Sequence, residues 1–208
     1  MKSFKKMLKN IFFLSGLVIL LISLSNCQDL FTTNFFSFLQ TDPADMSRDE
    51  LIQYGWDVIA IGDEEKMAAA YNAAENMLAD NPDDGELSYL AANLAIELSG
   101  LADFLINPPQ DDVNEYKSGL DADYIMEAGD YFQTADINDI ELNAVDSIYC
   151  GIGLLLYTAG GDFDIMEAID IDSPGPGETE GASYIDAGTD VLGSDFRDLI
   201  ILVFFTVV

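Results

Sequence analysis

Residues 47–62 read Ser-Arg-Asp-Glu-Leu-Ile-Gln-Tyr-Gly-Trp-Asp-Val-Ile-Ala-Ile-Gly, and they contain the start, the apolar face and the end of one helix. The Ser47 hydroxyl can accept a hydrogen bond from the amide of Glu50, and the Glu50 carboxylate can reach back to the amide of Ser47. This capping box predicts a helix start. Gly62 readily takes the left-handed conformation that ends helices. We therefore predict a helix over residues 47–61.

The same helix carries a pattern that recurs along the chain. Leu51, Tyr54, Gly55 and Val58 place one small residue among apolar residues on a single helical face. The pattern reappears as Leu87, Leu90, Ala91 and Leu94, and further copies begin at Ile125, Ser147 and Tyr184. The small residue lets a neighbouring helix approach closely, while the apolar residues fill the groove on either side. The pattern therefore predicts helices that pack on one another.

The other predicted elements follow from apolar periodicity and from the turn residues between periodic segments. Further helices are predicted over residues 64–79, 85–98, 121–135, 139–158 and 182–192. Two loops are predicted at residues 105–118 and 171–181, which are rich in Pro, Gly and acidic residues. The apolar residues 199–208 are too few to cross a bilayer as a helix. They either cover the last helix pair, stay exposed as an aggregation hazard, or precede further sequence.

The spacing over residues 47–100 resembles that of tetratricopeptide (TPR) repeats, which pair antiparallel helices with a period of about 34 residues. The positions that match the first helix of the motif are Leu51, Tyr54, Gly55, Val58 and Gly62, and those that match the second are Met67, Tyr71 and Ala74. The resemblance implies an all-α fold of stacked antiparallel helix pairs, a TPR-like α-solenoid with a concave face suited to peptides or helices. The alternative is an irregular helical bundle with a core rich in Ala and Gly.

The N-terminus has the composition of a secretory signal peptide. Four lysines within residues 2–9 precede an apolar run over residues 11–24, which is shorter than the roughly 20 residues of a membrane-spanning helix. The next residues, Leu24-Ser25-Asn26-Cys27, resemble the lipobox of bacterial lipoproteins, although Asn26 stands where Gly or Ala is usual. The resemblance implies cleavage before Cys27, acylation at that cysteine and stable anchoring. The alternative is a cleavable signal or an uncleaved anchor without lipid.

These segments divide the chain into three parts. Residues 1–26 form the predicted signal peptide, residues 27–46 the lipidated N-terminus and tether, and residues 47–208 the TPR-like helical domain. Five bulky apolar residues within residues 31–39 distinguish the tether from a flexible polar linker. Part of the tether is therefore expected to dock on the domain or to rest at the membrane surface.

The charge of the chain restricts its partners. The sequence has 38 acidic and 8 basic residues, with a formal net charge of −30. Residues 27–208 contain every acidic residue but only four basic ones: Arg48, Lys66, Lys117 and Arg197. So acidic a surface repels nucleic-acid phosphates and anionic lipid headgroups, which excludes nucleic acid as a partner. Half of all residues are hydrophobic, which favours a folded domain over disorder.

The sequence offers little for catalysis. It contains no histidine, the commonest general base and transition-metal ligand. It also lacks a P-loop, a dinucleotide-binding glycine fingerprint and a serine nucleophile elbow. The acidic residues 162–172 suggest calcium ligands, but an EF-hand loop that starts at Asp170 fails, because its fifth position is Pro174 and its twelfth, which needs an acidic ligand, is Gly181. We predict neither an enzyme nor a metal or cofactor site.

Four single residues carry further expectations. Tyr54 and Tyr71 lie at helical spacing and are expected in the core, as is Cys150, which favours a packing role over a reactive thiol. Trp56 lies off the apolar stripe, and core packing and partner contact are equally compatible with its position.

Together these features predict a non-catalytic protein–protein interaction scaffold in the bacterial cell envelope. Its expected partners are the lipid bilayer, through acylated Cys27, and another envelope protein. Its expected location is the outer membrane or the outer face of the cytoplasmic membrane. The alternatives are an accessory lipoprotein of a TRAP-type solute transporter and a structural surface lipoprotein without a defined ligand.

Overall fold

The computed structural model describes residues 42–107, 117 and 119–205. The chain divides between Asp42 and Pro43, and the helical domain begins at Pro43. Within the described residues all regular structure is helical, so the predicted all-α fold class is confirmed. The lipobox residues Leu24, Ser25, Asn26 and Cys27 lie outside the described residues. Among the described residues, no helix combines the length and the apolar character needed to cross a bilayer.

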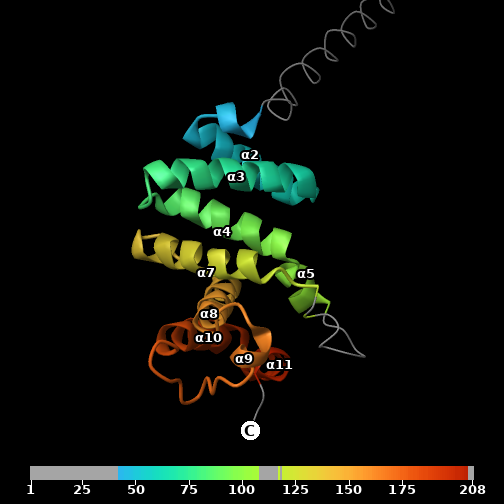
Figure 1. Ribbon diagram of the computed structural model, residues 1–208, viewed down its shortest axis with the longest axis vertical. Coiled ribbons are helices and arrows are strands. Elements are labelled where there is room, and N and C mark those ends of the chain that lie inside the picture. The colour runs from blue at the N-terminus through green and yellow to red at the C-terminus, as the bar shows by residue number, and fades with distance from the viewer. Residues whose placement is uncertain (1–41, 108–116, 118, 206–208) are drawn as a thin grey trace, which may run out of the picture. The chain divides into compact units, whose positions relative to one another are not determined.

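The helices of the domain follow one another along the chain, with a long loop before α10 (Figure 1). A 3-10 turn, Pro43–Asp45, precedes the α-helices. These are α2 (Arg48–Ile61), α3 (Glu64–Asp80), α4 (Gly85–Ser99), α5 (Leu101–Ile106), α7 (Ala122–Ile137), α8 (Ala144–Thr158), α9 (Phe163–Met166), α10 (Thr179–Leu192) and α11 (Ser194–Phe204).

Short polar side chains fix where most helices begin. Before α2, both halves of the predicted capping box form, and the Ser47 amide donates to Glu50 Oε2 at 2.9 Å. The helix ends at Gly62, whose φ of 72° is left-handed as predicted. The remaining side-chain caps are Asp63 for α3, Asp84 for α4, Asp121 for α7, Asn143 for α8 and Asp162 for α9. Several of the many aspartates therefore accept hydrogen bonds from backbone amides in the first turns of helices, which have no partner within the helix.

The helices pack in series along the chain. α2 and α3 form a hairpin, α4 packs against both, and α7 packs against α4. Figure 1 shows α3, α4 and α7 as successive layers, whereas α8 crosses α7 at a steep angle. The series continues with α8 against α7, α10 against α8 and α11 against α10. The domain is thus a stack of helices whose direction changes at α8.

The residues of the first two copies of the repeated pattern lie in the core. Eleven residues named by the pattern and by the TPR resemblance are buried: Leu51, Tyr54, Gly55, Val58, Met67, Tyr71, Ala74, Leu87, Leu90, Ala91 and Leu94. Gly62 is exposed and acts as the cap of α2. A Cβ atom on Gly55 would lie 2.6 Å from Leu90 Cδ1. The Leu90 side chain of the second copy therefore packs directly against the Gly55 backbone of the first copy.

The later glycines of the pattern mark the closest helix crossings. A Cβ atom on Gly129 of α7 would lie 2.8 Å from the carbonyl carbon of Gly153 in α8. A Cβ atom on Gly151 of α8 would lie 2.6 Å from the carbonyl oxygen of Gly181 in α10. A Cβ atom on Gly188 of α10 would meet the carbonyl oxygen of Ala144 and would lie 2.6 Å from Cγ1 of Ile148, both in α8. Both faces of α8 are therefore in near backbone contact with a neighbouring helix.

The predicted start of the helix over residues 139–158 is wrong. α8 begins five residues later because Asn143 accepts from first-turn amides and Asp146 reaches back to the Asn143 amide, a second capping box. Upstream, Asp139 has a φ of 66°, which interrupts helical geometry after α7. Apolar periodicity alone does not separate this turn from the helix that follows.

The two predicted loops extend too far into helices. Leu105 and Ile106 belong to α5, where Leu101, Phe104 and Leu105 are buried. The second loop ends at Glu178, because α10 begins at Thr179. The short helices α5 and α9 carry too few turns to show a period in the sequence.

The apolar C-terminal segment forms most of α11, a helix that the sequence did not predict. Ile200, Val203, Phe204 and Phe205 are buried, and the ring of Phe204 meets that of Phe104 edge to face at 5.6 Å. Arg197 of α11 pairs with Asp172 and Asp186. The sequence left open whether this segment is buried, exposed or followed by further sequence. The four residues named here are buried against the other helices.

Candidate functional site

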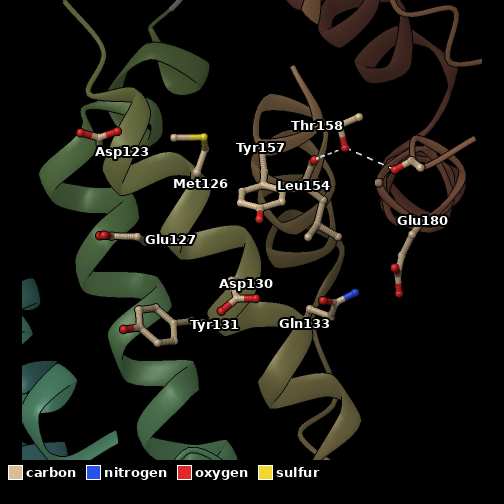
Figure 2. A pocket seen from close by; sticks show the side chains of 12 residues that line it. Asp123, Met126, Glu127, Asp130, Tyr131, Gln133, Leu154, Tyr157, Thr158 and Glu180 are labelled. Carbon is tan, nitrogen blue, oxygen red and sulfur yellow. Dashed lines mark hydrogen bonds between the residues drawn. The ribbon is translucent and has the colours of Figure 1, made fainter. Parts of the chain in front are cut away.

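A cleft lies between α7, α8 and α10, with a volume of about 900 Å³ (Figure 2). Its lining residues come from three separate segments and combine carboxylates with apolar and aromatic groups. They are Asp123, Met126, Glu127, Asp130, Tyr131, Gln133, Leu154, Tyr157, Thr158, Gly177, Glu180 and Gly181. Such a volume suits a small molecule or a few side chains of a larger partner.

Glycine contacts position the walls of the cleft. The Gly129–Gly153 crossing holds α7 against α8, and the Gly151–Gly181 contact holds α8 against α10. At the end of α8, the Thr158 hydroxyl lies 3.0 Å from the Leu154 carbonyl oxygen and 3.3 Å from that of Gly177. The loop before α10 is thereby tied to α8, and both contacts are drawn in Figure 2.

The apolar part of the cleft is formed by Met126, Leu154 and Tyr157. Tyr157 has 72% of its surface exposed, although a tyrosine ring buries apolar area readily when a partner is available. In Figure 2 its ring stands between α7 and α8, with Met126 on the facing helix. The cleft therefore offers an accessible aromatic surface.

The charged part of the cleft has one sign only. Asp123, Glu127 and Asp130 project from α7, and Glu180 projects from α10 (Figure 2). The four basic side chains in the described part of the chain all form ion pairs with carboxylates that do not line the cleft. The pairs join Arg48 to Asp49, Asp84 and Glu86, Lys66 to Asp63, Lys117 to Glu167, and Arg197 to Asp172 and Asp186. No described side chain neutralises the cleft carboxylates.

A cluster of three tyrosines and two glutamates adjoins the cleft; we call it the tyrosine–glutamate cluster. It consists of Tyr71 and Glu75 from α3 and of Tyr124, Glu127 and Tyr131 from α7. The Tyr71 hydroxyl donates to Glu127 Oε2 at 2.6 Å. The Tyr71 ring meets Tyr124 and Tyr131 edge to face, with centroids 5.3 Å and 6.3 Å apart. Glu127 and Tyr131 belong to both the cluster and the cleft.

Burial and repulsion disfavour negative charge in this cluster. Desolvation, and then the nearby charge of Glu127, raise the pKa of Glu75, while hydrogen bonds from Tyr71 and Tyr131 oppose the rise. Desolvation also raises the pKa of Tyr131 to about 12, and burial likewise raises the pKa of Tyr71. The cluster thus holds two carboxylates close together without a cation, an arrangement that a positive ligand would relieve.

The residues that line the cleft could not be recognised as binding residues from the sequence. Tyr71 was predicted as a packing residue; it is buried and also joins the tyrosine–glutamate cluster. The other residues predicted to pack between repeats within residues 47–100 do not line the cleft. The one available signal was the third copy of the pattern, because its Gly129 brings α7 and α8 together beside the cleft. With 38 acidic residues in the chain, no individual carboxylate stands out from the sequence.

Two other residues singled out in the sequence lie outside the cleft. Trp56 is 38% exposed, and its ring lies 5.7 Å from that of Tyr89 at a tilt of 50°. It therefore combines partial packing with an exposed edge. Cys150 is buried, and desolvation raises the pKa of its thiol. Such a thiol remains protonated at neutral pH.

The acidic segment over residues 162–172 is used structurally at several points. Asp162 caps α9, Glu167 pairs with Lys117, and Asp172 pairs with Arg197. Across the described ranges, no three potential metal-ligating side chains converge on a common point.

No model of a known protein family matches the chain, and neither a curated protein nor a solved structure shows significant similarity to it. A functional hypothesis is therefore drawn from the N-terminal sequence and from the chemistry of the cleft.

Proposed function

We propose that this protein is an exported, lipid-anchored binding protein of the bacterial cell envelope. In this proposal it has no catalytic role and acts as a scaffold that holds another envelope protein. The lysines, the apolar run and the lipobox-like residues 24–27 support export and anchoring. The cleft between α7, α8 and α10 supports binding.

The cleft carries the binding part of the proposal because it offers an exposed aromatic ring beside unneutralised carboxylates. Aromatic residues in concave sites supply much of the affinity at protein interfaces. A volume of about 900 Å³ accommodates one segment of a partner rather than a whole domain. We therefore assign the cleft as the surface where an envelope partner inserts a segment.

Site-specific photo-crosslinking in intact cells tests this assignment. A photoreactive phenylalanine analogue is placed at Tyr157, which is 72% exposed in the cleft, or at Ile61, which is 58% exposed at the end of α2. The proposal predicts one defined product from position 157 that is absent from position 61. The protein identified must also bind the purified full-length chain, more weakly with Tyr157→Ala and unchanged with Ile61→Ala. Equal labelling from both positions, or no product at all, would contradict the proposal.

The anchor is tested separately at Cys27. Cys27→Ser should abolish incorporation of labelled palmitate and shift the protein from the membrane fraction to the soluble fraction, because a thioether-linked lipid requires the sulfur atom. Cys150→Ser is the matched control and should leave both lipid labelling and fractionation unchanged. Unaltered membrane retention of Cys27→Ser would show that another segment holds the protein at the membrane.

A further inference from the structure

We infer that the cleft recognises an extended segment of a partner protein through its lysine or arginine side chains. This inference rests on the proposed binding function and specifies its ligand chemistry. A lysine or arginine side chain has an apolar stem and a cationic head. The cleft has the complementary parts: an apolar wall formed by Met126, Leu154 and Tyr157, and carboxylates on the helices that flank it.

The positions of two carboxylates favour this occupant. Asp130 belongs to α7 and Glu180 to α10, so the two acids approach the cleft from different walls, and Tyr157 projects from α8 between these helices (Figure 2). In this inference the cationic head lies in the field of the cleft carboxylates, and its stem packs on the aromatic ring. A tyrosine face also attracts a cation directly.

Other ligand classes fit less well. An anionic ligand would be repelled by the four cleft carboxylates. A wholly apolar segment would remove these carboxylates from water without giving them a partner, which is costly. A bound divalent cation would require converging ligands, and the described residues contain no such group. A cation with an apolar stem satisfies both parts of the lining.

The open form of the cleft favours a protein segment over a free organic cation. Tyr157 is largely exposed, so a small cation would remain half-solvated and would gain little from burial. A peptide supplies additional contacts along its backbone and places successive cations near further carboxylates. Glu127, which lines the cleft and belongs to the tyrosine–glutamate cluster, lies within this extended surface.

Fluorescence anisotropy with the full-length protein in detergent tests the inference. The probe is a labelled peptide of alternating lysine and alanine, and its counterpart carries acetylated lysines. Because the whole protein is a polyanion, the essential comparison is between variants with the same net charge. The cleft variant is Asp130→Asn with Glu180→Gln, and the control is Asp83→Asn with Glu65→Gln, both exposed and outside the lining.

The expected result is a loss of about tenfold in peptide affinity for the cleft variant and less than about twofold for the control, since distant exposed charges are screened by salt. Tyr157→Ala should weaken binding about threefold, whereas Ile61→Ala should not change it. Thermal melts of all variants establish that folding is retained. The acetylated peptide should not bind measurably.

Three outcomes would overturn the inference. Equal losses in the cleft variant and the control would show that the peptide senses only bulk charge. Equal binding of the acetylated peptide would indicate an apolar occupant. Competition by spermidine at the same concentration of positive charge would indicate a small organic cation instead of a protein segment. In any of these cases, photo-crosslinking from position 157 can still identify a partner. The proposed binding function would then be supported, and only the inference that the partner binds through lysine or arginine would be wrong.

Discussion

Glycine residues inside helices are the residue-scale feature on which the packing of this protein depends. A glycine in a helix interior costs about 1 kcal/mol relative to alanine, so it needs a compensating contact. Gly129 and Gly153 have one, because each occupies the space where a Cβ atom of the other would stand. The close approach of α7 and α8 also forms one side of the cleft. The same two residues therefore serve packing and the candidate site.

Gly129→Ala should lower the free energy of unfolding by about 1–2 kcal/mol, because overpacking against backbone outweighs the gain in helix propensity. The added Cβ atom would lie 2.8 Å from the carbonyl carbon of Gly153, which has no side chain that can move aside. Gly55→Ala is the matched control, since the atom it meets is Leu90 Cδ1 at the end of a flexible side chain. Its loss should be smaller. Urea denaturation followed by circular dichroism measures both, and a larger loss for Gly55→Ala would contradict the packing assignment.

At the scale of elements, the sequence reveals helices with clear end signals and fails where the signals are short or varied. Ser47, Glu50 and Gly62 define α2 from local hydrogen bonding alone. The start of α8 was misplaced because its capping box uses Asn143 and Asp146 in place of serine and glutamate. Short helices such as α5 and α9 give no period to detect.

The candidate site could not be predicted because it depends on how elements cross. Its lining combines residues from α7, from the end of α8 and from the start of α10. Each contributes an acidic or aromatic residue of a kind found throughout the chain. Only the steep crossing of α8 over α7 brings them together, and a repeat pattern specifies close approach without specifying the angle of approach (Figure 1).

An ion pair joins the start of α2 to the start of α4. Arg48 at the start of α2 donates to both oxygens of Asp84, at 2.6 and 2.8 Å, and Asp84 in turn caps α4. Asp84→Asn should lower the free energy of unfolding at pH 7 by about 2 kcal/mol, because the cap remains but the bidentate charge-assisted pair is lost. Asp83→Asn, which changes the charge equally at an exposed neighbour, should have little effect.

The loss in Asp84→Asn should depend on pH in a defined direction. Hydrogen bonding to Arg48 lowers the pKa of Asp84 below its ordinary value of 3.8. A carboxylate with a lowered pKa in the folded state stabilises the fold above its unfolded pKa, and this stabilisation disappears as the pH falls through the folded value. The difference between wild type and Asp84→Asn should therefore be constant above about pH 5 and shrink below the ordinary pKa. A difference that grows on acidification would exclude the ion pair as its cause.

For the whole molecule, charge is the dominant physical property. The chain carries 38 acidic residues and 8 basic ones. In the described part, every basic side chain is already paired, often with more than one carboxylate. Most acidic residues thus repel one another without local compensation, and this repulsion is weaker in the expanded unfolded chain. The same excess leaves the cleft available to a cationic partner.

Salt should therefore stabilise this protein. Raising NaCl from about 10 mM to about 300 mM shortens the Debye length from roughly 30 Å to roughly 6 Å, which screens the repulsion among distant carboxylates. Screening also weakens the seven ion pairs of the described residues. The exposed pairs contribute at most about 1 kcal/mol each. The pairs made by Asp84 and Lys117, whose side chains are largely buried, are screened less. We expect the Tm to rise by about 5 °C, which corresponds to roughly 1–2 kcal/mol for a domain of this size. KCl is the control: an equal rise in both salts identifies screening, whereas a Tm that falls with salt, or that rises with one cation alone, would show that general repulsion does not govern stability.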